Sequence, residues 1–396
     1  MGVKILALAG ALSLAGCASA QVDAPAATRL TTPEALATPT APPVARDPAD
    51  LQVLFWSDGQ RSERFRRMED WFAGLEAAPD PAPRALPAGA PLPEDTAARL
   101  RELMDSTNAA GVMLLQDGRV RFEEYRLGFG PDQRWTSFSV AKSFTSTLLG
   151  AAVRDGRIAS LDDRVTRYIP ELSGSAYDDV TVRQLATMTS GVRWNEDYTD
   201  PNSDVAQLAR YVADHGKDAI VAQMRTLERE APAGSKWVYK TGETNLIGLL
   251  VENAVGMPLA AYAKAKIVDP AGFAGGLFWM TDPRGGNVGG CCLSLRLADY
   301  ARFGQFVLEG GGEVVPAGWF DEAGRAQVDL GRGYGYGYQW WTYPGGYGAQ
   351  GIFGQAITLI PSRGMLLAVV SNWPTATAEG NRRKFEAVLG EIAKEP

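Results

Sequence analysis

Histidine is nearly absent from this chain: among 396 residues, only His215 is a histidine. A Ser-His-Asp hydrolase would have to use it, yet no nucleophile motif lies near it, and no G-x-S-x-G turn presents a serine elsewhere. We therefore expect His215 on a surface loop. Cysteine is also rare, with Cys17, Cys291 and Cys292. One histidine and three thiols do not build the usual zinc sites, so we expect neither a metal nor an organic cofactor.

Basic stretches are missing as well. The formal net charge is −7, and no run of lysine and arginine interrupts the acidic balance. A nucleic-acid footprint needs a basic patch or stripe, so we expect no nucleic-acid partner. The length suffices for one large domain, or for two domains that share a core.

The first 17 residues are typical of an export signal, with Lys4 before a short apolar core that cannot span a bilayer. Leu14-Ala15-Gly16-Cys17 resembles a bacterial lipobox, which implies lipidation of Cys17. The next residue is Ala18 rather than aspartate, which implies the outer membrane. We expect a periplasmic protein held to the membrane by an N-terminal lipid anchor. The alternative is plain secretion, with cleavage after residue 20.

Residues 18–50 are rich in alanine, proline and threonine and have few large apolar side chains, which predicts a flexible tether. The folded domain is expected over 51–396, with its core over about 95–396. Aromatic residues between 51 and 75 predict a helical segment that packs on this core. A second proline-rich linker is expected over 77–93.

The order of the expected elements predicts the fold class. A hairpin is expected near the start of the core, at 111–125, and strands return at 336–342, 355–360 and 365–372. Helices are expected between and beside them, over 96–104, 139–155, 181–190, 294–308 and 378–394. We predict an α/β (α+β) domain: a mainly antiparallel sheet built from both ends of the chain, flanked by helices, with a helical lobe.

Ser139 and Lys142 form the only S-x-x-K in the sequence. On a helix, residues three apart share one face, so the hydroxyl and the amine can meet. A serine is a poor nucleophile at neutral pH until a neighbouring base takes its proton, and the amine supplies one. A capped helix with a solvated lysine would give the same pattern, so the flanking sequence is needed to distinguish it from a catalytic pair.

Several flanking blocks occur in an order that resembles the class C-like branch of the serine β-lactamase and penicillin-binding-protein family. After Ser139-Val140-Ala141-Lys142 come Asp155-Gly156-Arg157-Ile158, then Thr181 to Gly191, then Pro232-Ala233-Gly234-Ser235 before Tyr239. The resemblance covers roughly residues 111–372. It implies a β-lactamase/transpeptidase-like fold and catalysis through an acyl-enzyme on Ser139.

Lys240-Thr241-Gly242 spells the K-T-G of class A enzymes, but more than a third of the chain follows it. By the resemblance, Tyr239-Lys240-Thr241 instead matches a Y-x-N motif in which Thr241 replaces asparagine. Tyr239 then joins Lys142 as general base and acid, and a nearby ammonium would favour its phenolate. A core tyrosine is the alternative interpretation.

The third motif departs from the family at Gly351-Ile352-Phe353-Gly354-Gln355. Ile352 stands where relatives have a lysine or histidine that binds the carboxylate of β-lactams, which argues against efficient β-lactamase or D,D-peptidase activity. Gly354 is retained. The resemblance implies an oxyanion hole made by the backbone N–H groups of Ser139 and Gln355.

A narrower similarity lies in Trp194-Asn195-Glu196-Asp197-Tyr198 and the residues after it. It resembles the branch that includes 6-aminohexanoate-dimer hydrolase and related carboxylesterases, and implies that Tyr198 binds substrate. From the second and third motifs, Thr241, Ile352 and Gly354 are the other expected substrate-binding residues. A solvated loop is the alternative for Tyr198. The adjacent Cys291 and Cys292 are expected as two small buried thiols, because a disulfide between neighbours is strained.

The sequence therefore predicts a serine hydrolase that cleaves a small ester or amide through a Ser139 acyl-enzyme, with Lys142 and Tyr239 moving the proton. The alternative is a penicillin- or peptidoglycan-binding sensor or scaffold without turnover. The substitutions at Thr241 and Ile352 leave room for it. The sequence does not predict an oligomeric state.

Overall fold

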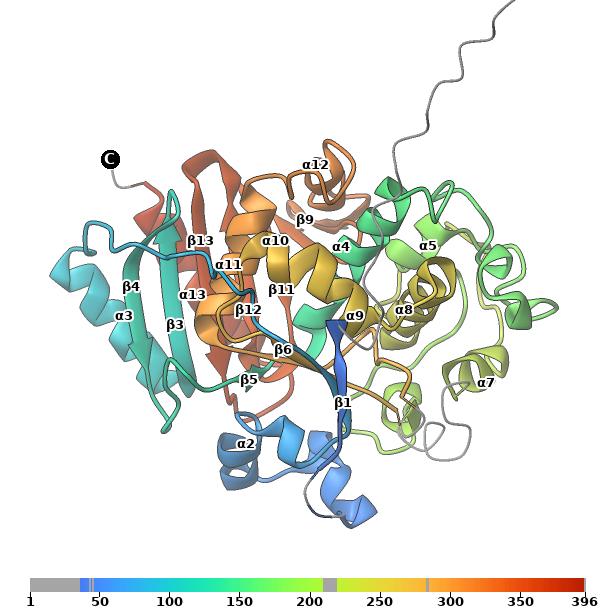
Figure 1. Ribbon diagram of the computed structural model, residues 1–396, viewed down its shortest axis with the longest axis horizontal. Coiled ribbons are helices and arrows are strands. Elements are labelled where there is room, and N and C mark those ends of the chain that lie inside the picture. Colours follow the sequence, from blue (N-terminus) through green and yellow to red (C-terminus); the bar gives the residue numbers. More distant parts are fainter. Residues whose placement is uncertain (1–35, 43, 45, 209–218, 283–284, 395–396) are drawn as a thin grey trace, which may run out of the picture. The chain divides into compact units, whose positions relative to one another are not determined.

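The computed structural model describes residues 36–42, 44, 46–208, 219–282 and 285–394. The described residues belong to one compact unit. Cys17 with the predicted export signal, residues 18–35 of the predicted tether, and His215 lie outside the described residues. Figure 1 shows the arrangement of the elements.

The larger sheet joins the two ends of the domain. Its eight strands run in the order β4-β3-β13-β12-β11-β10-β9-β8, and every neighbouring pair is antiparallel. One strand in from the β4 edge, β3 (Ala109–Gln116) pairs with β13 (Met365–Ser371), with Val112 opposite Val369. Both strands are almost wholly buried, which explains their continuous apolar sequences. The predicted fold class, an antiparallel sheet assembled from both ends with helices around it, is confirmed.

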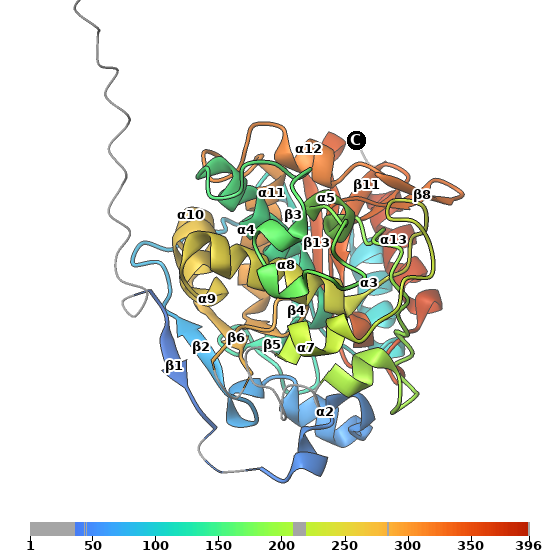
Figure 2. The ribbon, with the colours of Figure 1, turned by 90° about the vertical axis from the view of Figure 1, so that its right-hand side faces the viewer.

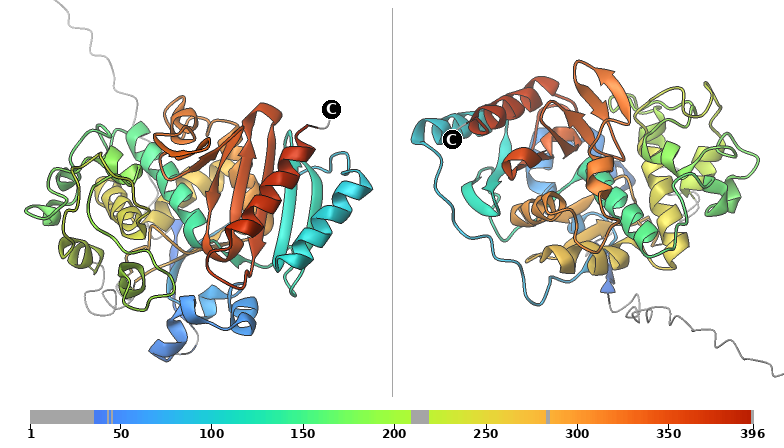
Figure 3. Two further views of the ribbon diagram at one scale, coloured as in Figure 1. Left: turned by 180° about the vertical axis from the view of Figure 1, so that it is seen from behind. Right: turned by 90° about the horizontal axis from the view of Figure 1, so that it is seen from above.

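Helices cover both faces of this sheet, as the views in Figure 3 show. On one face lie α3 (Glu94–Ser106) and α13 (Glu379–Ile392), which close a smaller core that includes Leu100, Phe122 and Leu389. On the other face α11 (Leu297–Leu308) packs on β3, β12 and β13. This second face holds the main core, which extends into the helical lobe.

The helical lobe contains α4 (Ala141–Arg154), α5 (Val182–Ala186), α7 (Ala219–Arg225), α8 (Thr241–Val255) and α9 (Leu259–Ala263). It lies beside the sheet in Figure 1 and in front of it in Figure 2, and α4 packs directly on α8. No single helix among the described residues is long and apolar enough to cross a membrane. The segments Thr241–Val255 and Leu259–Ala271 meet that criterion only together, across a 75° bend.

A second sheet, whose strands β2 and β6 contact α9, has its strands in the order β1-β2-β6-β7-β5. Its strand β1 (Thr38–Thr40) falls within the predicted tether and pairs with β2 (Gly74–Ala77). Part of the predicted tether is therefore structured, because the backbone of Thr38–Thr40 finds partners in β2. The remaining strands are β5 (Trp135–Thr136), β6 (Leu277–Met280) and β7 (Leu293–Leu295).

One expected strand, 336–342, is two strands in the structure, β9 (Tyr334–Tyr336) and β10 (Trp341–Tyr343). The chain leaves the sheet between them because Gln339, with φ 64°, donates its backbone N–H to Ala186 O of α5 at 3.1 Å. Ser143 Oγ of α4 in turn donates to Gln339 O at 2.8 Å. These bonds join the sheet to the lobe.

The other elements are short. The strands are β4 (Arg119–Tyr125), β8 (Val328–Gly331), β11 (Gly346–Gln350) and β12 (Ala356–Ile360). The helices are α2 (Asp58–Arg64), α10 (Asp269–Ala271) and α12 (Trp319–Ala323), with a π-helical turn, η8 (Lys264–Val268). The 3-10 turns are η1 (Pro48–Leu51), η2 (Val53–Phe55), η3 (Met68–Asp70), η4 (Phe138–Val140), η5 (Val165–Arg167), η6 (Pro170–Leu172), η9 (Ile352–Gly354) and η10 (Pro361–Arg363).

Candidate active site

Ser139 lies in the 3-10 turn η4, directly before α4, which begins at Ala141 and carries Lys142 in its first turn. Ser139 is half-buried, whereas Lys142 is buried. The residue before the serine, Phe138, has a left-handed backbone with φ 43°. For a residue other than glycine, such a conformation costs on the order of 1–3 kcal/mol and is typical of functional turns.

The amine of Lys142 has three hydrogen-bond neighbours. Its Nζ lies 2.7 Å from Gly290 O and 3.0 Å from Thr241 Oγ1. The third neighbour is Ser139 Oγ, at 3.2 Å. A carbonyl oxygen only accepts, so one proton of the amine belongs to Gly290 O. The sequence expectation that the amine and the hydroxyl meet agrees with this geometry.

Glu196 decides what the Thr241 hydroxyl can do. Thr241 Oγ1 donates its single proton to Glu196 Oε1 in a short contact, and Thr241 N donates to Glu196 Oε2 at 2.9 Å. Having given its proton away, Thr241 Oγ1 can only accept from Lys142. A neutral amine has two protons, which it donates to Gly290 O and Thr241 Oγ1. Its lone pair can then accept the proton of the Ser139 hydroxyl.

Burial favours the neutral form of the Lys142 amine. Removal from water lowers the pKa of Lys142 to about 8, and the Glu196 carboxylate opposes the shift. At pH 7 roughly a tenth of the amine is then neutral, whereas a solvated lysine with a pKa of about 10.4 is almost wholly charged. The site contains an amine base next to a serine hydroxyl.

Tyr239 also lies beside Ser139, close enough for the two hydroxyls to interact. Its ring stacks on Trp341, with 5.5 Å between centroids, and Lys142 Nζ lies 5.3 Å from the ring centroid. Burial, followed by the charge of Glu196, raises the pKa of Tyr239 above its usual value. The expected shift toward the phenolate is therefore not found, and Tyr239 is a proton donor at neutral pH.

Gln355 follows the turn η9 and leads into β12. Its side chain is buried and bonded to Ser371 of β13, from Nε2 to Ser371 O at 2.9 Å and from Ser371 N to Oε1 at 2.9 Å. The same turn packs against the segment before Ser139: a Cβ on Gly351 would lie 2.5 Å from Ser137 O. The two turns that carry the expected oxyanion-hole residues are therefore neighbours.

Three of the four expected substrate-binding residues line one cavity, and the fourth does not. Ile352 and Tyr198 line the large cavity that contains Ser139, and Tyr198 donates its hydroxyl to Glu196 Oε1 at 2.8 Å. Thr241 lines the same cavity. Gly354 faces the other way, since a Cβ there would lie 2.3 Å from the Trp373 ring. The structure thus places Gly354 as a packing position behind the turn.

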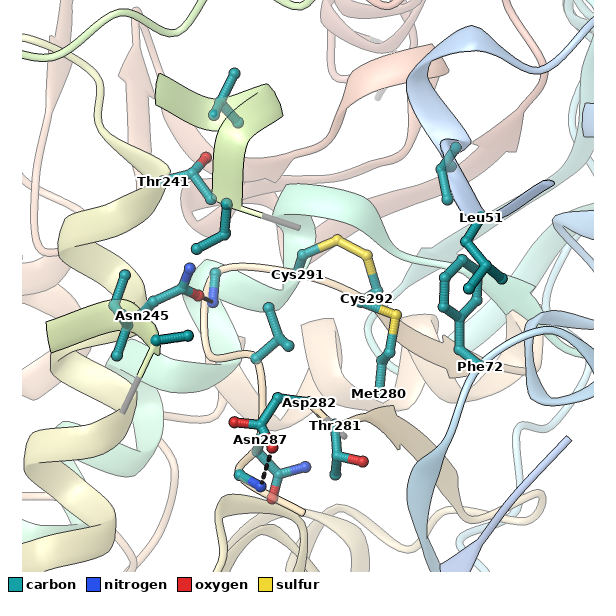
Figure 4. Close-up of a pocket in the computed structure, with 18 of the residues that line it drawn as sticks. Leu51, Phe72, Thr241, Asn245, Met280, Thr281, Asp282, Asn287, Cys291 and Cys292 are labelled. Carbon is teal, nitrogen blue, oxygen red and sulfur yellow. Dashed lines mark hydrogen bonds between the residues drawn. A yellow bond between two sulfur atoms is a disulfide. The ribbon is translucent and has the colours of Figure 1, made fainter. Parts of the chain in front are cut away.

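The cavity has a volume of about 1130 Å³ and two chemically different sides. Figure 4 shows Thr241 and Asn245 on one side and the apolar Leu51 and Phe72 on the other. The aromatic-rich segment expected to pack on the core therefore also builds a wall of this cavity. Sequence reasoning did not predict that contribution, because no local pattern links residue 51 or 72 to the serine.

Between these sides the structure joins Cys291 and Cys292 by a disulfide, which is labelled in Figure 4. The expectation of two thiols is therefore wrong for this structure. Backbone bonds on both residues hold the pair: Trp279 Nε1 donates to Cys291 O at 3.1 Å, and Met280 N donates to Cys292 O at 3.2 Å. Within the described ranges, no group of three or more His, Cys, Asp or Glu side chains is placed to hold a metal ion.

Several known proteins are similar to this chain in sequence or in fold. The 6-aminohexanoate-dimer hydrolase of Paenarthrobacter ureafaciens is 30% identical over 309 residues, covering 69% of this chain and 75% of that protein. A β-lactamase of Lysobacter lactamgenus is 26% identical over 195 residues, covering 48% of this chain and 46% of that protein. Both relatives are hydrolases.

A solved structure from Bacillus anthracis, described as a candidate 6-aminohexanoate-dimer hydrolase, has a TM-score of 0.78 at 21% identity. The match covers 88% of this chain and 98% of that one, and it confirms the expected β-lactamase/transpeptidase-like fold. A family model described as Beta-lactamase matches residues 96–390, which is most of the chain. The chain therefore belongs to the Beta-lactamase family.

Proposed function

We propose that this protein is a serine hydrolase that cleaves an ester or amide through an acyl-enzyme on Ser139. The observation that carries the proposal is the environment of Lys142. Its two other acceptors direct the lone pair of the neutral amine toward Ser139 Oγ, 3.2 Å away. A scaffold that never reacts covalently has no need of a base directed at a hydroxyl, whereas an acylated sensor does, so turnover distinguishes the hydrolase from the sensor.

In the first step Ser139 Oγ bonds to the substrate carbonyl carbon while its proton moves to Lys142 Nζ. The carbonyl π electrons move onto oxygen, and the backbone N–H groups of Ser139 and Gln355 stabilise that negative charge. The lysine becomes an ammonium, for which Glu196 is the nearby counter-charge. Glu196 thus opposes the cost of forming a charge in a buried site.

Collapse of this intermediate breaks the bond to the leaving group, which takes the Tyr239 proton. The Lys142 ammonium, whose Nζ lies 5.3 Å from the Tyr239 ring centroid, then returns its proton to the tyrosinate. Water next attacks the acyl carbon and loses a proton to Lys142. The bond between that carbon and Ser139 Oγ breaks, Lys142 gives its proton back to Oγ, and the carboxylic acid leaves. The raised pKa of Tyr239 keeps it protonated until the leaving group needs the proton.

The lining of the cavity favours a substrate with a hydrocarbon chain. Leu51 and Phe72 form an apolar wall, and Met280 with the disulfide lies beside it. Each buried methylene contributes about 0.8 kcal/mol. Ile352, which lines the cavity, offers no charge to a carboxylate. We therefore propose that the substrate is a linear aliphatic ester or amide rather than a penicillin. This proposal is compatible with the name of the Paenarthrobacter relative.

We also propose that the chain is exported and anchored to the membrane through Cys17, with the folded domain in the periplasm. The Leu14-Ala15-Gly16-Cys17 sequence supports this proposal. Metabolic labelling with a radioactive fatty acid should mark the wild-type chain and not Cys17→Ser. Equal labelling of both chains would contradict it.

A fluorophosphonate probe and a p-nitrophenyl ester test the proposed reaction together, on wild type, Ser139→Ala and Tyr239→Phe. We expect wild type to be labelled on Ser139 and to turn over, and Ser139→Ala to do neither. Tyr239→Phe should lose about a hundredfold in turnover, since general acid–base groups contribute about 10² to 10⁴. Labelling without turnover in wild type would favour the sensor, and turnover by Ser139→Ala would exclude the serine mechanism.

A further inference from the structure

Both turns of the expected oxyanion hole contain a phenylalanine in a left-handed backbone conformation. Phe138, directly before Ser139, has φ 43°, and Phe353, two residues before Gln355, has φ 58°. Side chains other than glycine, asparagine and aspartate rarely adopt this region. Such residues persist only where surrounding structure over-determines them. Each turn therefore needs an external support.

The two phenylalanines support one another and share a third ring. Phe138 and Phe353 have ring centroids 5.4 Å apart. Phe65 contacts both, with centroids 4.9 Å from Phe138 and 5.4 Å from Phe353. Phe65 is 0% exposed, and the other two are 3% and 2% exposed. We call these three residues the aromatic clamp. Its rings join the turn before the nucleophile to the turn before Gln355.

Phe65 is itself held firmly at the end of α2. Its carbonyl oxygen accepts the Thr136 N–H at 2.8 Å, and its ring meets Trp135 edge-on at 5.9 Å. One turn earlier, the guanidinium of Arg61 lies 5.0 Å from the Phe353 ring centroid. Arg61 Nε also donates to Asn372 Oδ1 at 2.7 Å. The α2 segment thus contacts the Phe353 ring twice, through Phe65 and through Arg61.

Phe353 has little freedom to absorb a change at its ring. Its N–H donates to Ala376 O at 2.9 Å, and its carbonyl accepts the Trp373 N–H at 3.1 Å. On the other turn, Ser137 N donates to Leu293 O at 2.7 Å. Since both turns are fixed on their outer sides, the ring contacts between them set how the two N–H groups face each other.

We propose that Phe65 is a positioning residue for the oxyanion hole: it sets the spacing of the Ser139 and Gln355 N–H groups through Phe138 and Phe353. This inference rests on the proposed function. Phe65 precedes residues 96–390, the part of the chain that the family model matches. The segment before the matched region therefore completes the catalytic geometry as well as lining the cavity.

Phe65→Leu and Phe65→Ala in the full chain test the proposal, with Phe122→Leu as the matched control. Phe122 is a buried phenylalanine that also has an arginine over its ring, but it belongs to the small core on the other face of the sheet. We expect Phe65→Leu to lower kcat about tenfold with KM within about twofold, because the hole stabilises charge that develops only in the transition state. Phe122→Leu should keep kcat within about twofold.

A second readout isolates the oxyanion hole from general loosening. Sulfur accepts hydrogen bonds more weakly than oxygen, so a well-formed hole prefers an ester to the matching thionoester. That preference should fall in both Phe65 variants and persist in Phe122→Leu. Phe65→Leu with wild-type kcat and ester preference would overturn the proposal. So would unfolding of both Phe65 variants below the assay temperature, measured by circular dichroism, since it would assign Phe65 to overall stability.

The result also separates this inference from the proposed reaction. Inactive Ser139→Ala together with unaffected Phe65 variants would overturn the positioning role alone. Active Ser139→Ala would remove the serine mechanism and with it the oxyanion hole.

Discussion

The two sides of the cavity differ in chemistry and in origin. On one side Ser139, Lys142 and Thr241 are linked by hydrogen bonds, and all lie within the family-matched residues 96–390. On the other side Leu51 and Phe72 present apolar surface, and both precede residue 96. The polar side therefore lies within the matched family region, whereas the apolar side comes from a segment that precedes it. By the function proposed here, the polar side performs the reaction and the apolar side selects the substrate.

This difference predicts two kinds of defect. Changes on the polar side should alter kcat and its pH dependence for every substrate. Changes on the apolar wall should alter the preference among substrates and leave the pH dependence unchanged. The variants below test this division, from the largest expected effect to the smallest.

Lys142→Met should have the largest effect. Methionine keeps the length of the side chain but removes the base and leaves Gly290 O and Thr241 Oγ1 without their donor. We expect kcat/KM for a p-nitrophenyl ester to fall by about 10³-fold, within the usual range for a general base. Lys394→Met, near the chain end, should match wild type. A loss below tenfold in Lys142→Met would show that another group takes the proton.

Glu196→Gln should have an intermediate effect on the same side. Glutamine replaces one carboxylate oxygen by an NH₂ group, which cannot accept a hydrogen bond from Thr241. The Thr241 hydroxyl, which now donates its proton to Glu196, would then be held less firmly in that orientation. We expect kcat to fall about tenfold. Removal of the carboxylate should also lower the pKa of Lys142 further below about 8, because Glu196 now opposes the effect of burial.

The control for Glu196→Gln is Glu102→Gln, a change on the exposed face of α3. It should leave both kcat and the pH midpoint at their wild-type values. A pH midpoint that moves upward in Glu196→Gln would contradict the assigned direction of the electrostatic effect.

Phe72→Ala should have the smallest effect, and only on selectivity. In wild type we expect kcat/KM to rise about two- to fourfold per added methylene from acetate to octanoate esters, since each buried methylene contributes about 0.8 kcal/mol. Loss of the Phe72 ring should reduce the octanoate-to-acetate ratio about fourfold, which corresponds to one buried methylene. Leu330→Ala, an exposed position on β8, should leave the ratio unchanged. A uniform loss for all chain lengths in Phe72→Ala would break the division between the two sides.

Short-range spacing explains what could be predicted from the sequence. Ser139 and Lys142 are three residues apart, so one helical turn suffices to bring them together. The strands β3 and β13 were recognisable because each is a continuous apolar run, and their pairing follows from an antiparallel sheet built from both ends. Thr241 was expected to touch substrate, and the structure shows in addition its bonds to Lys142 and Glu196.

The missed features all depend on long-range packing. Glu196 reaches Thr241 across 45 positions of sequence, and no spacing rule connects them. Phe65 meets Phe138 and Phe353 only because α2 folds back onto the catalytic turn. A positive φ is predicted from the sequence only where a glycine stands, so the positive φ of a phenylalanine could not be predicted. The aromatic content of residues 51–75 was the available signal, and it indicated packing on the core without indicating where.

The pH dependence of fluorophosphonate labelling tests the central claim most directly, because it reports the nucleophilicity of Ser139 without deacylation. Lys142 must be neutral to accept the proton, and its neutral fraction grows as pH rises through its pKa of about 8. The labelling rate of wild type should therefore rise between pH 6.5 and 9.5 with a midpoint near 8, and Lys142→Met should be slow and without that midpoint. A wild-type rate that is flat over this range, or a midpoint that survives in Lys142→Met, would contradict the assignment of Lys142 as the base.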